Sequence, residues 1–233
     1  MDTRQEQLLK AIVQEYVRTA EPVGSNFIVQ KYRFGVSPAT IRNDMAELEE
    51  GGFIVAPHTS AGRVPTETGY RYYIQNFLSP KQTKVKQLEE FRQKAAKEDD
   101  REELLKSVAK FLAVNTGEAV IVGLTPRHYY STGFGALFAK PEFAEAAFMR
   151  DFSEIMDKLD EVMAALWGTV PDNIQILVGH ESPFGDRCGT IVTRFNTGDE
   201  SGILGVLGSL RMNYDRNYSL ISYARKMLRD LRV

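Results

Sequence analysis

A short run of small polar and basic residues in the first quarter of the chain carries side-chain types that can hydrogen-bond to DNA base edges. Arg42 can donate two hydrogen bonds to a guanine, and Asn43 can pair with an adenine. Small residues that can approach a thymine methyl group or bind a phosphate lie beside them: Ser37, Ala39 and Thr40. This pattern predicts a surface that recognises DNA sequence.

A second polar segment has the composition of a DNA-contacting loop. Residues 57–62 are small or polar and lie between two short runs, 53–56 and 63–65, which is the pattern of a β-hairpin with an open tip. A tip of this kind can lie along the phosphate backbone or in a minor groove. The contacts that we predict in it are His58, Thr59, Ser60, Gly62 and Arg63.

Helical spacing of apolar residues predicts four helices within residues 1–78, and the third carries the base-reading residues. Thr3 and Glu6 fit a capping box for the first helix. Ser37 fits the N-cap of the third helix, with Pro38 at its first position. The predicted inward face of this helix is Ile41, Met45 and Leu48. Three helices, a hairpin and a further helix form a winged helix-turn-helix, in which the second motif helix enters the major groove.

The rest of the chain predicts a helical segment followed by a mixed domain. Residues 79–118 suggest two charged amphipathic helices broken near residues 98–100. We interpret them as a linker and possible dimer seam, because helices with a narrow apolar stripe need a partner. The pattern beyond predicts strands at 119–124, 174–178, 189–195 and 202–207, a strand or turn at 129–137, and helices at 141–166 and 214–231. The fold class is therefore α+β: a winged-helix domain (1–78), a helical linker (79–118) and an α/β domain (119–233).

Composition restricts the function classes. The 233 residues include 29 basic and 31 acidic side chains, so any DNA contact depends on local charge rather than on the net charge of −2. The chain has one cysteine, Cys188, and three scattered histidines, which gives neither a zinc-binding spacing nor a catalytic constellation. We expect no metal, no cofactor and no enzymatic activity. Without a long apolar run or a signal-peptide pattern, we expect a cytoplasmic protein and no membrane partner.

Longer motifs resemble the HrcA family of bacterial heat-inducible transcription repressors. In the N-terminal part they are residues 21–25, 35–49, 57–66 and 69–73. In the C-terminal part they are residues 141–143, 179–182 and 205–214. Motifs of this length are far more specific than a general helix-turn-helix pattern.

The resemblance implies a homodimer that represses chaperone operons by binding an inverted-repeat DNA operator, the CIRCE element. It also implies a GAF-like C-terminal domain and activity maintained by the chaperonin GroEL. The chain departs from the family pattern where Thr125 leads almost directly to Tyr129, because family members carry an inserted dimerisation domain there. A second hypothesis is a regulator whose GAF-like domain senses a small molecule, by analogy of fold. A third is an enzyme acting through Cys188, which has no basic partner nearby in the sequence.

Overall fold

The structure is a computed structural model that divides into two units, Met1–Leu78 and Ser79–Val233. It describes residues 1–59, 61–80, 85–197 and 200–230. Within these ranges, no helix combines the length and the apolar character needed to cross a lipid bilayer.

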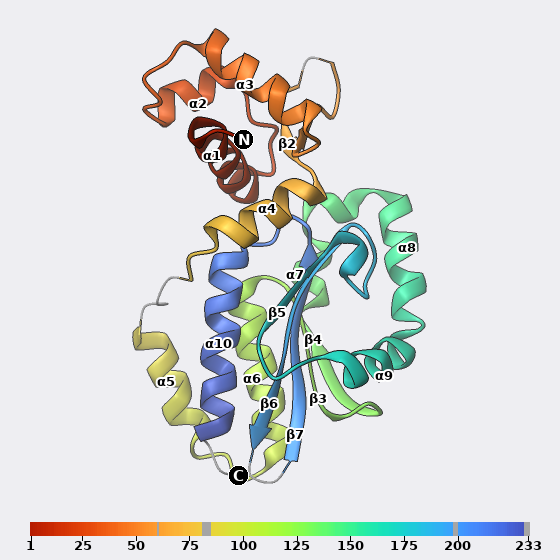
Figure 1. Cartoon of the computed structure of the whole chain (residues 1–233). Coiled ribbons are helices and arrows are strands. Elements are labelled where there is room, and N and C mark those ends of the chain that lie inside the picture. The colour runs from red at the N-terminus through yellow and green to blue at the C-terminus, as the bar shows by residue number, and fades with distance from the viewer. Residues whose placement is uncertain (60, 81–84, 198–199, 231–233) are drawn as a thin grey trace. The chain divides into compact units, whose positions relative to one another are not determined.

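The first unit packs its helices around one core and adds a short hairpin (Figure 1). Its elements are α1 (Thr3–Thr19), α2 (Ser25–Lys31), α3 (Pro38–Glu50), β1 (Ile54–Val55), β2 (Val64–Pro65) and α4 (Glu67–Phe77). The two strands pair antiparallel, and Arg63, just before β2, forms an isolated antiparallel bridge with Val23. The predicted inward residues Ile41, Met45 and Leu48 are buried. The order of elements confirms the winged helix-turn-helix prediction.

The helix caps of this unit show one difference from the sequence prediction. Asp2, not Thr3, caps α1: its Oδ1 accepts from the Gln5 backbone N–H at 2.8 Å, and Gln5 Oε1 accepts from the Asp2 N–H at 3.0 Å. The capping box therefore lies one residue earlier, because an aspartate caps as well as a threonine and adds a negative charge at the positive helix end. Ser37 caps α3 as predicted, since its Oγ accepts from the Thr40 N–H at 3.2 Å.

The second unit is a five-stranded antiparallel sheet covered by helices on both faces (Figure 1). The strands are β3 (Ala119–Thr125), β4 (His128–Thr132), β5 (Gln175–Val178), β6 (Cys188–Thr197) and β7 (Glu200–Ser209), in the order β4-β3-β7-β6-β5. The helices are α5 (Val85–Ala95), α6 (Arg101–Thr116), α7 (Phe134–Phe138), α8 (Ala146–Met156), α9 (Leu159–Thr169) and α10 (Tyr214–Asp230), with 3-10 turns η1 (Pro141–Ala144) and η2 (Gly179–Glu181). Helices on an antiparallel sheet confirm the α+β class.

The long helix predicted for residues 141–166 is wrong. The segment forms η1, α8 and α9 instead, with bends at Glu145 and at residues 157–158. A straight helix of that length would extend about 39 Å along one line. The bends bring aromatic rings together over the sheet: Phe143 stacks on Phe148 at 4.5 Å between centroids and meets Phe152 edge-on at 5.5 Å. The predicted strand or turn at 129–137 divides similarly into β4 and α7.

Residues predicted as a linker include a helix that is part of the second core. The break near residue 98 is confirmed, because Asp100 caps α6 by accepting from the Glu102 N–H at 2.8 Å. The apolar stripe of α6 is buried against β3, β4 and α10. Helix α5 packs against α6 through Phe91, whose ring stacks on the ring of Phe111 with 4.1 Å between the centroids. The sheet of the same chain thus covers the α6 stripe, so this stripe needs no second copy.

A buried carboxylate lies where β3 begins. The Glu118 side chain is 2% exposed; its Oε1 contacts the Lys140 ammonium, while its Oε2 has no hydrogen-bond partner among the described residues. A side chain at position 208 would not fit, since a Cβ there would lie 2.4 Å from Oε2. Burial raises the pKa of Glu118 from 4.5 to about 7, and Lys140 offsets this only in part.

We expect Glu118 to make the second unit less stable as the pH rises. The folded state holds the proton up to about pH 7 and the unfolded chain releases it near 4.5, so the contribution is full below pH 4.5 and is lost as the pH rises through 7. The loss amounts to at most about 3 kcal/mol. Urea unfolding followed by Trp167 fluorescence between pH 4.5 and 8 measures it. Glu118→Gln should abolish this fall, whereas Glu161→Gln, at an exposed carboxylate of the same unit, should keep it. The same pH profile in both variants would contradict the prediction.

Candidate nucleic-acid interface

The predicted base-reading residues lie on one exposed face at the N-terminal half of α3. Arg42 and Asn43 are exposed, and neither side chain has a hydrogen bond or ion pair within the described ranges. Ala39 is exposed beside them, Thr40 is half-buried, and the Ser37 hydroxyl lies 3.0 Å from the Thr40 hydroxyl. We call these five residues the reading face. Its guanidinium and amide groups are available to a ligand, while Ser37 and Thr40 are partly used by the helix cap.

The wing, residues 54–65, brings together the second predicted group. His58 and Thr59 are exposed at its tip, where the Ala61 N–H donates to the His58 carbonyl at 2.9 Å. Ser60 lies outside the described residues. Gly62 lies at the base of the wing rather than at its tip, against the backbone of Val23. Among the described residues, the tip therefore exposes the polar side chains of His58 and Thr59.

Arg63 differs from the other predicted contacts because its guanidinium is already bound within the protein. Its Nε donates to Glu49 Oε2 at 2.9 Å, and its Nη2 lies 2.8 Å from the same oxygen. The arginine side chain is 24% exposed. Glu49 is on α3, so this ion pair joins the wing to the helix that carries the reading face.

Two further carboxylates, which the sequence analysis did not single out, hold the helices of the first unit together. Arg4 on α1 binds both oxygens of Asp44 on α3, at 2.7 and 2.8 Å. Burial favours the neutral form of Glu15, but hydrogen bonds from Lys31, Arg18 and Tyr32 outweigh it and hold its pKa at about 2. The available signal was spacing, since Asp44 lies three residues after Ile41 on the inward face of α3. The Arg4–Asp44 pair joins α1 to α3, and the Glu15 contacts join α1 to the end of α2.

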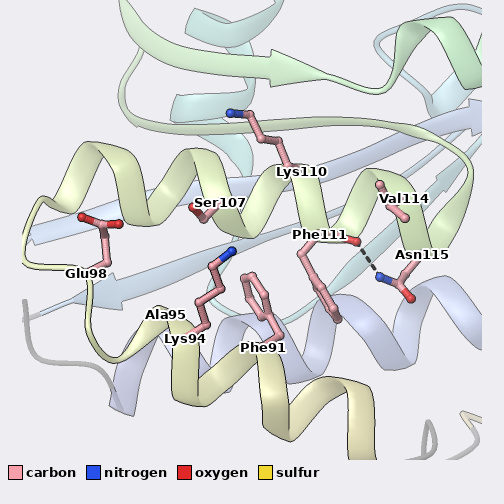
Figure 2. A pocket seen from close by; sticks show the side chains of 9 residues that line it. All are labelled: Phe91, Lys94, Ala95, Glu98, Ser107, Lys110, Phe111, Val114 and Asn115. Carbon is pink, nitrogen blue, oxygen red and sulfur yellow. Dashed lines mark hydrogen bonds between the residues drawn. The ribbon is translucent and has the colours of Figure 1, made fainter.

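A groove in the second unit is the place to test the small-molecule hypothesis. It has a volume of about 350 Å³ and lies between α5 and α6 (Figure 2). Phe91, Phe111 and the exposed Val114 give it apolar walls. Lys110 is directed away from α5, as Figure 2 shows, and its ammonium lies 5.9 Å from the Tyr130 ring centroid. The groove is an open, mostly apolar surface in which polar groups do not converge on a common point.

The structure gives Cys188 no reactive character. The thiol is fully buried, and burial raises its pKa to about 12, so it stays protonated at neutral pH. Within the described ranges, no group of three acidic, histidine or cysteine side chains is arranged to hold a metal ion. The glycines of residues 202–208 form part of β7, where Gly202 and Gly208 allow close approach of neighbouring atoms.

Fold and site together define a winged helix-turn-helix domain joined to an antiparallel α+β unit. Residues 4–66 match the family described as a DeoR-like helix-turn-helix domain, and residues 72–217, more than half of the chain, match the family described as the HrcA protein C-terminal domain. The chain belongs to the HrcA family.

Curated relatives agree with this assignment, and a solved structure shares the fold. The relative from Pelotomaculum thermopropionicum is 46% identical over 129 residues, 54% of this chain and 36% of its own length. That from Desulforudis audaxviator is 58% identical over 80 residues, 34% and 23% of the two chains. Both relatives are named heat-inducible transcription repressor HrcA. The matches span only 23% to 36% of the length of these relatives. A crystal structure described as a hypothetical protein shares the fold, with a TM-score of 0.80 at 20% identity over 100% of this chain and 97% of that one.

Proposed function

We propose that this chain is a cytoplasmic, sequence-specific DNA-binding repressor of heat-shock genes that binds a CIRCE-type inverted repeat as a dimer. The reading face carries the proposal: Arg42 and Asn43 are exposed and unpaired among the described residues, on a helix whose capped N-terminal half is free of acidic side chains. Such side chains at this position of a helix-turn-helix read base edges in the major groove. The names of the relatives support the class of target gene.

The proposed contacts divide into base reading and backbone positioning. Arg42, Asn43 and Ala39 read bases, while Ser37 and Thr40 bind phosphate together with the N–H groups at the start of α3. The wing adds His58, Thr59, Ser60 and the backbone at Gly62. The first acidic residue of α3 is the inward-facing Asp44. The exposed acidic residues of this helix, Glu47 and Glu50, lie toward its C-terminal end, away from the end that we propose enters the major groove of DNA.

Two-fold symmetry of the operator is the reason for proposing a dimer. In such a complex the two α3 helices enter successive major grooves, roughly 34–36 Å or a multiple apart. Sedimentation of the chain with and without the inverted repeat measures the stoichiometry. The effect of the chaperonin GroEL is a separate part of the proposal: adding it should raise the fraction of the chain that is competent to bind the operator.

Binding to a labelled CIRCE-type inverted repeat tests the proposal directly. Affinity is compared with that for a scrambled duplex of the same composition at one near-physiological salt concentration, because salt alone changes affinity by orders of magnitude. We expect at least a thousandfold preference for the inverted repeat, on the order of that seen for specific DNA-binding proteins. Equal, salt-sensitive binding to both duplexes would overturn the proposal.

A further inference from the structure

The Glu49 side chain uses both carboxylate oxygens to connect α3 with the wing. Its Oε1 accepts from the backbone N–H of Ala56, just after β1, at 2.9 Å. Its Oε2 accepts from Arg63, just before β2, at 2.9 Å. One carboxylate on α3 therefore holds both segments of the wing, one just after β1 and one just before β2.

The remaining guanidinium nitrogen of Arg63 is directed at the wing itself. Its Nη1 lies 3.4 Å from the Ala61 carbonyl and 3.5 Å from the Gly62 carbonyl. The backbone of Arg63 is also held, because it exchanges two hydrogen bonds of 2.9 Å with Val23. The charged group thus faces the interior of the wing base.

Glu49 occupies an unfavourable place unless it has this connecting role. It lies in the last turn of α3, where the helix dipole disfavours a negative charge. It also places a negative charge beside a surface that we propose to face phosphate groups. Two charge-assisted contacts from the wing offset both effects.

We infer that Glu49 and Arg63 form a latch that fixes the wing relative to the reading face, so that Arg63 positions the wing rather than binding phosphate. This inference rests on the proposed function, and it assigns Arg63 a different role from that expected from its sequence. Because the latch is neutral as a pair, it contributes orientation and no net charge to the interface.

Substitution of Glu49 distinguishes a latch from a phosphate contact by the sign of the effect. With a latch, Glu49→Gln in the full chain lowers affinity for the inverted repeat about three- to tenfold and leaves the salt slope unchanged. If Arg63 binds phosphate, Glu49→Gln removes a repulsive charge and frees the arginine, so affinity rises. A rise in affinity overturns the inference.

A double-mutant cycle adds a second test. With a latch, Arg63→Gln and the double variant Glu49→Gln/Arg63→Gln lose about as much affinity as Glu49→Gln alone, because all three variants break the shared Glu49–Arg63 ion pair. With a phosphate contact, Arg63→Gln lowers the salt slope by about 1. The matched control is Glu67→Gln, which removes a carboxylate of similar exposure that pairs with Arg71 on α4; it should leave affinity unchanged.

Hydrogen exchange without DNA separates this inference from the proposed function. Glu49→Ala should accelerate exchange at the Ala56 amide while amides inside α1 stay protected, and unchanged exchange at Ala56 overturns the latch. A wild-type chain that shows no preference for the inverted repeat overturns the proposed function alone, since the exchange measurement still decides whether the latch exists.

Discussion

Replacement of Arg42 by alanine is expected to weaken binding to the inverted repeat by about 1–3 kcal/mol, a loss of roughly 5- to 160-fold. The side chain is exposed on α3 and has no partner among the described residues, so its removal leaves the fold intact. The loss arises because a bidentate contact to guanine is absent and the base keeps unpaired acceptors. Titration of operators with each base pair substituted in turn measures the change in specificity.

The pattern across those operators decides the role of Arg42. Relaxed preference at one base position supports base reading, and a uniform loss with a lower salt slope would instead place Arg42 on the phosphate backbone. Arg216→Ala, an exposed arginine of the second unit, removes the same charge and should change affinity little. Unchanged operator affinity in Arg42→Ala would contradict the proposed role of the reading face.

Replacement of Gly62 by alanine is expected to destabilise the first unit by about 2–4 kcal/mol. An added Cβ would lie 2.5 to 2.7 Å from backbone atoms of Val23. Relief of that overlap requires the backbone to move, which breaks the two hydrogen bonds between Val23 and Arg63 at the wing base. The melting temperature of the unit should fall by about 10 °C or more, followed by circular dichroism.

Two controls make the Gly62 result specific. Gly24→Ala has open space around the added atom and an ordinary φ of −92°, so it should cost less than about 1 kcal/mol. The fluorescence of Trp167, the single tryptophan of the chain, reports the second unit and should be unaffected by either change. Equal stability of the Gly62 and Gly24 variants would contradict the prediction, because it would show that the backbone near Val23 can move without loss of unfolding free energy.

Local signals in the sequence were sufficient for the winged-helix domain. Ser37 and Pro38 mark the start of α3, and the spacing of Ile41, Met45 and Leu48 gives its buried face, because both features act within a few residues of the backbone they stabilise. The exposed positions of Arg42 and Asn43 follow from the same periodicity. The capping box lies one residue earlier than predicted, because Asp2 and Thr3 are both residue types that cap helices and local sequence does not distinguish them.

Tertiary structure alone decided the features that depend on residues distant in the chain. The bends in residues 141–169 follow from packing aromatic rings over a sheet whose strands come from both sides of that segment. The burial of Glu118 follows from the same assembly, and the pairing of Arg63 with Glu49 depends on how the wing folds back onto α3. A sequence shows that a side chain is charged, but whether that charge meets a ligand or an opposite charge of the same protein depends on which distant segments the fold brings within hydrogen-bond distance.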